Sequence, residues 1–191
     1  MATREFRTLG TLRSAGNRRV SGVAVRYGSP SRELYEMGQR FTEVIERGAL
    51  TADPAGDVLL LYGHDVNRLL ARTSSGTLQL DDRDDGLHFF AELPDTADGR
   101  DTYELIQRGD LSGCSFAFRC DADRWDSKAK PPVRTVERAM ISEISLVSQP
   151  AYTSTSVHAR SAIDEPAAMV RLRLRAAARR ERYIAIQRLK R

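Results

Sequence analysis

The 191-residue sequence has few cysteines and histidines, and each shortage excludes a class of protein. Its two cysteines, Cys114 and Cys120, are too few for a disulfide framework. The three histidines, His64, His88 and His158, show no spacing typical of zinc ligands. We therefore expect no metal and no other cofactor, and any mechanism that needs a histidine must use one of these three.

Long apolar runs are also missing. The longest, from Val58 to Tyr62, falls far short of the roughly 18 residues that a membrane-spanning helix needs. The first ten residues alternate charged and uncharged side chains where a secretory signal would have an apolar core. We therefore expect neither a membrane protein nor one secreted by that route. With 41% hydrophobic and 29% charged residues, the composition is typical of a folded globular domain.

Charge is distributed unevenly along the chain. Residues 166–191 hold nine basic residues and one acid, a net charge of +8, whereas residues 1–165 carry 21 basic and 25 acidic residues, a net charge of −4. A basic tail on a mildly acidic body predicts binding of the tail to a polyanion or to an acidic protein surface. The alternative is a solvated, arginine-rich helix.

Short alternating or apolar runs, separated by turn residues, predict a β-rich domain between residues 18 and 150. Seven such runs suit a barrel or a sandwich. They are Arg19 to Tyr27, Val58 to Tyr62, Thr77 to Asp81, Gly86 to Glu92, Gly113 to Asp121, Thr135 to Ile141 and Glu143 to Ser148.

Two segments have helical spacing instead. Phe41 to Arg47 is followed by Gly48, and Asp98 to Arg108 is amphipathic with Gly109 placed as its C-terminal cap. The sequence therefore predicts a mainly β fold with flanking α-helices. We place one domain at residues 1–161 and a basic, helical tail at residues 162–191.

A glycine and two aromatic residues surround a serine in the run from Leu111 to Phe118. Because side chains alternate along a strand, Ser115 shares a face with the small residues Gly113 and Ala117, while Cys114 points the other way. Small neighbours leave room for a substrate backbone beside the hydroxyl. The alternative is an ordinary strand serine on a solvated face.

A serine nucleophile needs a base, and histidine is the usual one because its pKa lies near neutral pH. We favour His64, which follows a buried strand and a glycine, over His88 in an alternating strand. A carboxylate should orient the imidazole. Glu143, in a largely apolar strand, is our first choice, and Asp65 is its rival; the alternative role for Glu143 is a salt bridge to an arginine.

Five segments, taken in order between about residues 20 and 160, resemble the prohead maturation protease family of tailed bacteriophages. That family is thought to share its fold with the herpesvirus assemblin proteases. The segments are Phe41 to Ala49, Gly63 to Asp65, Gly86 to Phe89 with Leu93 to Thr96, Gly109 to Phe118, and Glu143 to Tyr152.

The resemblance implies an assemblin-like β-barrel and a serine endopeptidase. By carry-over, Ser115 is the nucleophile and His64 the general base; herpesvirus relatives use a second histidine in the third position, where Glu143 fits this sequence best. The implied setting is the immature capsid in the bacterial host cytoplasm, and the implied partners are the major capsid protein and its scaffolding segment. The enzyme would also cut itself, and the family favours self-association as a homodimer.

The basic tail then acquires a role as an internal address or removable segment, with nucleic acid as a secondary partner. Two other functions stay open from the residues alone. One is a non-catalytic assembly module that binds through its tail. The other is a different hydrolase that uses the same serine and histidine, because a fold and a triad do not fix the substrate.

Overall fold

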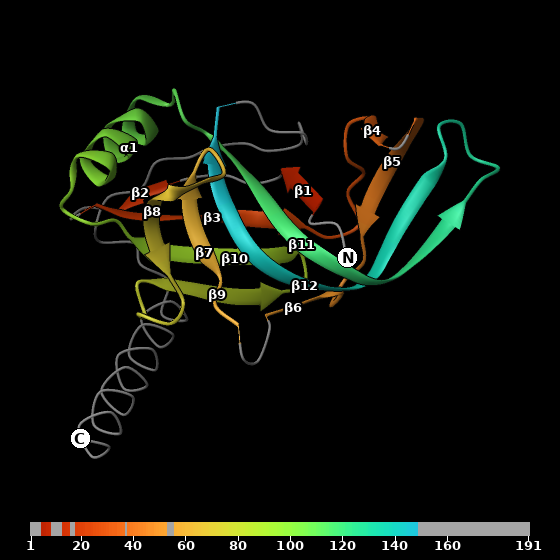
Figure 1. The fold of residues 1–191 in the computed structure, drawn as a ribbon, viewed down its shortest axis with the longest axis horizontal. Helices are drawn as coiled ribbons and strands as arrows, with labels where there is room; N and C mark the ends of the chain where they lie inside the picture. Colours follow the sequence, from red (N-terminus) through yellow and green to blue (C-terminus); the bar gives the residue numbers. More distant parts are fainter. Residues whose placement is uncertain (1–4, 9–12, 16–17, 37, 53–55, 149–191) are drawn as a thin grey trace, which may run out of the picture.

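A computed structural model describes residues 5–8, 13–15, 18–36, 38–52 and 56–148 of the chain (Figure 1). This part contains twelve strands and one helix. The strands are β1 (Glu5–Thr8), β2 (Arg13–Ala15), β3 (Arg19–Arg26), β4 (Leu34–Glu36), β5 (Gln39–Ile45), β6 (Leu50–Ala52), β7 (Leu59–Tyr62), β8 (Asp65–Arg72), β9 (Leu78–Arg83), β10 (Gly86–Glu92), β11 (Gly113–Asp126) and β12 (Val133–Val147), and the helix is α1 (Ala97–Arg108). The predicted tail, the domain boundary at residue 161 and His158 lie outside the described residues.

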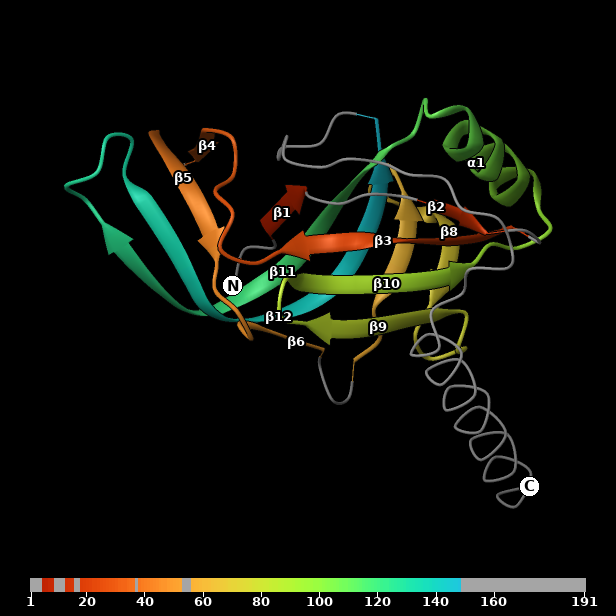
Figure 2. The same ribbon diagram turned by 180° about the vertical axis from the view of Figure 1, so that it is seen from behind.

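Strand β12 is the central strand of the larger, eight-stranded sheet and pairs with four other strands. One edge pairs with β11 in antiparallel fashion, and the other pairs in succession with the parallel strands β5, β6 and β7. Strand β1 extends the sheet beyond β11, and β8 pairs with β7. A second sheet, in the order β2-β3-β10-β9, lies behind the first and faces the viewer in Figure 2.

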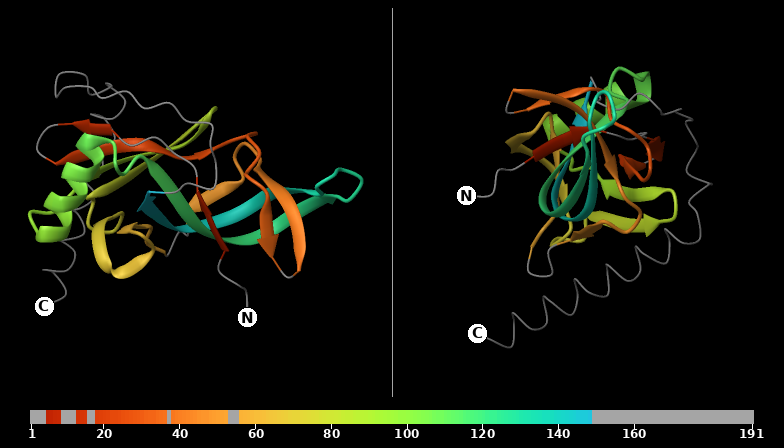
Figure 3. Two further views of the ribbon diagram at one scale, coloured as in Figure 1. Left: turned by 90° about the horizontal axis from the view of Figure 1, so that it is seen from above. Right: turned by 90° about the vertical axis from the view of Figure 1, so that its right-hand side faces the viewer.

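The two sheets enclose one hydrophobic core. Phe89 and Ala91 of β10 and Val20 and Ala24 of β3 belong to the same buried cluster as residues of β11 and β12. Burial of apolar surface at this scale is the main favourable contribution to folding. Helix α1 closes one end of the molecule, and the turn between β11 and β12 lies at the opposite end (Figure 3).

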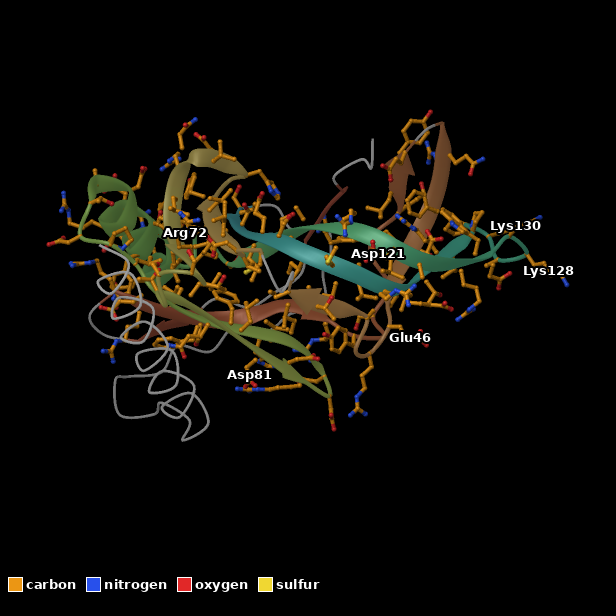
Figure 4. All side chains as sticks on the ribbon, turned by 60° about the horizontal axis from the view of Figure 1, so that its bottom comes forward. Glu46, Arg72, Asp81, Asp121, Lys128 and Lys130 are labelled. Atoms are coloured by element: carbon orange, nitrogen blue, oxygen red, sulfur yellow. The ribbon has the colours of Figure 1, made fainter. Side chains whose placement is uncertain are left out.

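The outer part of the β11–β12 hairpin forms, together with β4 and β5, an arm that projects from this core (Figure 1). Arg134 of β12 forms ion pairs with both neighbouring strands of the arm. Its Nη1 lies 3.2 Å from Oε2 of Glu43 on β5, and its Nε lies 2.6 Å from Oδ2 of Asp123 on β11. Glu43 is fully buried and Arg134 nearly so. Lys128 and Lys130 mark the tip of the arm (Figure 4).

The predicted helix from Phe41 to Arg47 is wrong, because this segment lies mostly within strand β5. Phe41, Glu43 and Ile45 are buried in alternation with less buried neighbours, which is the two-residue period of a strand. Val44 and Ile45 are β-branched and suit a strand, and Glu43 is held by its ion pair with Arg134. Tertiary contacts therefore outweighed the apparent helical spacing.

The other predicted helix is confirmed as α1. Thr96 caps its N-terminus by accepting a hydrogen bond from the Gly99 backbone N–H, and Gly109 ends it in the left-handed conformation at φ 82°. Glycine adopts that conformation without a steric penalty. With twelve residues in α1, the described part of the chain has no helix that is long and apolar enough to cross a membrane.

Asp57 holds together the open end of the β7–β8 hairpin. Its carboxylate accepts hydrogen bonds from the Thr73 hydroxyl at 2.7 Å, the Ser74 backbone N–H at 2.8 Å and the Ser74 hydroxyl at 2.9 Å. It also pairs with Arg72, labelled in Figure 4. Partial burial disfavours the ionised carboxyl, but these hydrogen bonds prevail and lower the pKa of Asp57 below its ordinary value.

We expect Asp57→Asn to reduce the free energy of unfolding by about 1 to 3 kcal/mol at pH 7, as for loss of hydrogen bonds to a charged group. Because the folded state lowers the pKa of Asp57, its stabilisation is present above the ordinary pKa of about 3.9 and is lost as the pH falls through the lower, folded-state pKa. Denaturant unfolding of wild type and Asp57→Asn at pH 7 and below pH 4 measures this contribution. The difference between their free energies of unfolding should be smaller in acid. The control is Asp84→Asn, whose exposed ion pair with Arg47 should contribute little to the free energy of unfolding. Equal stabilities of Asp57→Asn and wild type at pH 7 would refute the stabilising role of Asp57.

Candidate active site

His64 lies at the tip of the β7–β8 hairpin. Tyr62 and Asp65 pair across the two strands, which leaves Gly63 and His64 as a two-residue turn. Both have positive φ, 61° and 64°, as a type I′ turn requires. A non-glycine residue in this conformation is uncommon and occurs mostly where the surrounding structure holds it. The backbone of His64 is therefore set by the hairpin and by its contacts with β12.

Two of the sequence-predicted residues are in direct contact. The imidazole Nδ1 of His64 lies 2.6 Å from Oε1 of Glu143 on β12. Because an ionised carboxylate can only accept hydrogen bonds, we assign a proton to Nδ1. In the neutral imidazole Nε2 is then the nitrogen that accepts a hydrogen bond. This arrangement is the one by which a carboxylate orients a catalytic histidine.

Ser115 lies on the neighbouring strand and on the same face of the sheet. In the β11–β12 register Ser115 is opposite Ser145, and Glu143 lies two residues before Ser145 on β12. Residues that oppose each other across strands, and residues two apart along one strand, share a face. The backbone N–H of His64 donates to Ser145 Oγ at 3.1 Å, so the hairpin tip also lies against β12 here.

The site occupies the sheet face that points away from the main core. Cys114, Phe116, Ile144 and Leu146 belong to the hydrophobic cluster, and they alternate along β11 and β12 with the polar residues of the site. Glu143 and Ser145 are fully buried and Ser115 is 2% exposed, whereas the His64 side chain is 28% exposed. Within the described ranges, no three His, Cys, Asp or Glu side chains are grouped so that they could hold a metal ion.

Cys114, next to the serine, is a packing residue. Its side chain is fully buried in the hydrophobic cluster, and this burial raises the pKa of the thiol far above its ordinary value. The nucleophilic form of cysteine is the thiolate, so a buried thiol of this kind is unreactive. The expectation that Cys114 and Ser115 point to opposite faces is confirmed.

The rival residues have other partners. Asp65 Oδ1 accepts hydrogen bonds from the backbone and side-chain N–H groups of Asn67, at 2.9 and 3.1 Å. His88 lies on β10 in the other sheet, where its Nε2 is 2.8 Å from Asp85 Oδ1. Among the described residues, Glu143 and not Asp65 or Asp85 is therefore the carboxylate that contacts His64.

Two neighbours of the site were not predicted. Ser145 donates its hydroxyl to Glu143 Oε1 at 2.7 Å, and the signal for it is the Glu-x-Ser spacing, which puts both side chains on one face of a strand. Arg68 stacks 3.8 Å above the Tyr62 ring and pairs with Asp98 of α1 at 2.8 Å. These last contacts connect the hairpin that carries His64 to the helix.

Comparison with known proteins identifies the family. The family model described as caudovirus prohead serine protease matches residues 6–168, which is most of the chain and includes Ser115, His64 and Glu143. The chain belongs to this family. It is accordingly a serine protease of a bacteriophage prohead, a hydrolase that acts on peptide bonds. Neither a curated protein nor a solved structure matches it.

Proposed function

We propose that Ser115, His64 and Glu143 form the catalytic triad of this prohead protease. The observation that carries the proposal is the 2.6 Å contact of His64 with a fully buried carboxylate, beside the strand pair that holds Ser115. Ser115 Oγ attacks the scissile carbonyl while His64 Nε2 takes its proton, and Glu143 stabilises the imidazolium. His64 then gives the proton to the leaving amine and activates the water that hydrolyses the acyl-enzyme.

We propose as substrates the major capsid protein with its scaffolding segment, and this chain itself. Self-processing is supported by β1, which pairs with β11 so that Thr8 lies opposite Ser115. Directly opposed residues have Cα atoms about 4.5 to 5.5 Å apart, so the chain's own backbone lies beside the proposed nucleophile. The family resemblance implies further that the two sheets belong to an assemblin-like barrel, and that the enzyme works as a homodimer inside the prohead in the host cytoplasm. From its charge we propose that the basic tail binds an acidic scaffold or the inner surface of the capsid.

Coexpression with the phage's own major capsid protein tests this function. We expect the wild-type protease to shorten both the capsid protein and itself, and Ser115→Ala to leave both intact, as read from the intact masses of purified particles. Normal particles with uncut capsid protein from both forms would instead indicate a non-catalytic assembly module. Hydrolysis of small esters with no peptide cleavage would indicate a different hydrolase.

A further inference from the structure

Ser145 occupies the centre of the proposed triad without belonging to it. It is opposite Ser115 on β11 and next to Leu61 on β7, and it is fully buried. A buried hydroxyl needs hydrogen-bond partners, and here both partners are parts of the site. The residue thus lies between the strand of the nucleophile and the hairpin of the base.

The hydroxyl of Ser145 closes a ring of hydrogen bonds. It accepts from the backbone N–H of His64 at 3.1 Å and donates to Glu143 Oε1 at 2.7 Å. The same oxygen of Glu143 receives the His64 Nδ1–H at 2.6 Å. A hydroxyl has one hydrogen to donate and can accept as well, so a single serine satisfies both directions.

We propose that Ser145 is a positioning residue for catalysis, which fixes the backbone and the imidazole of His64 relative to Glu143. Two features require such a residue. The left-handed backbone of His64 is uncommon for a non-glycine residue, and Ser145 accepts its N–H. The carboxylate must also keep one orientation if Nε2 is to face the nucleophile, and the Ser145 hydroxyl holds the oxygen that binds the imidazole. The inference rests on the proposed triad.

The test uses Ser145→Ala in the full chain, with a fluorophosphonate as the probe because it needs no known peptide substrate. We expect the maximal rate of serine modification to fall about 10- to 100-fold, as for loss of a hydrogen bond to a charged group, while the half-saturating probe concentration stays the same. We also expect the far-downfield proton resonance of His64 Nδ1–H to move. Ser145→Thr, which keeps the hydroxyl, should restore most of the rate.

The matched control is Ser31→Ala. Ser31 is another buried serine whose hydroxyl accepts from a backbone N–H, that of Glu43 at 2.8 Å, but it lies beside β5 of the arm. It should leave the modification rate and the imidazole resonance unchanged. If Ser145→Ala does not fold, Ser145→Cys, which keeps the volume and weakens the hydrogen bonds, should show the same loss of rate.

Three outcomes are distinguishable. A folded Ser145→Ala or Ser145→Cys protein with the wild-type rate and resonance would overturn the inference alone. An equal loss of rate in Ser31→Ala would show that the effect is general destabilisation, and would also overturn it. Full modification of Ser115→Ala would overturn the triad itself, and the inference with it.

Discussion

Replacing Ser115 by alanine should abolish peptide cleavage, with a fall in kcat of at least about 10,000-fold. In the proposed triad Oγ of Ser115 is the atom that bonds to the scissile carbonyl, so the substitution removes the nucleophile. The adjacent thiol, Cys114, is buried and faces the core. Cleavage of the capsid protein, followed by intact mass, measures the effect.

The control for this variant is Ser142→Ala. Ser142 lies on β12 near the site, but it is exposed and its hydroxyl donates to the Ala117 backbone oxygen at 3.4 Å. We expect Ser142→Ala to cut at nearly the wild-type rate. Ser115→Ala should unfold at nearly the wild-type temperature, because it removes one small group from β11. Retained cleavage in Ser115→Ala would eliminate Ser115 as the nucleophile.

Replacing Glu143 by glutamine should lower kcat by about 1,000- to 10,000-fold. The amide has nearly the size of the carboxylate, but it carries no charge to stabilise the imidazolium. Its N–H₂ group can also donate to His64 Nδ1, which would place the imidazole proton on Nε2 and block that nitrogen as a base. Steady-state cleavage of the capsid protein, with KM and kcat separated, measures the loss, which should lie in kcat.

A matched control is Glu43, which among the described residues is the other fully buried glutamate. Glu43 pairs with Arg134 in the arm at 3.2 Å, away from the hairpin of His64. Breaking a buried ion pair costs about 3 to 5 kcal/mol of stability, so Glu43→Gln should unfold more easily. Below its unfolding temperature it should keep the wild-type kcat. Equal losses of kcat in both variants would mean that Glu143 matters for stability and not for orienting His64.

Local chemistry made several elements of the fold predictable. The span Gly86 to Glu92 was predicted as a strand from alternation, and α1 from its amphipathic spacing and its cap, Gly109. Strand β12 was predicted as two strands but is one, and it carries an extra residue, Ser142, where its register with β11 shifts between Ala117 and Phe118. Strand β8 was not predicted, since its exposed first half gives no apolar alternation.

The proximity of His64 and Glu143 was expected from their chemistry, and the structure confirms that they touch. No sequence pattern specifies that contact, because it depends on the parallel pairing of β7 with β12 over a separation of 79 residues. Ser145 was missed for a related reason. The hydrogen-bond partners of a serine in a strand can be predicted only when its neighbours across the sheet are known.

Intact-mass analysis after treatment with a fluorophosphonate tests the triad most directly, with wild type beside Ser115→Ala and His64→Ala. We expect one adduct per wild-type chain, mapped to Ser115, and none on either variant over the same time, because in the proposed triad the serine reacts only when His64 removes its proton. An adduct on Ser115 in the His64→Ala protein at the wild-type rate, or an adduct on another serine, would contradict the proposed triad.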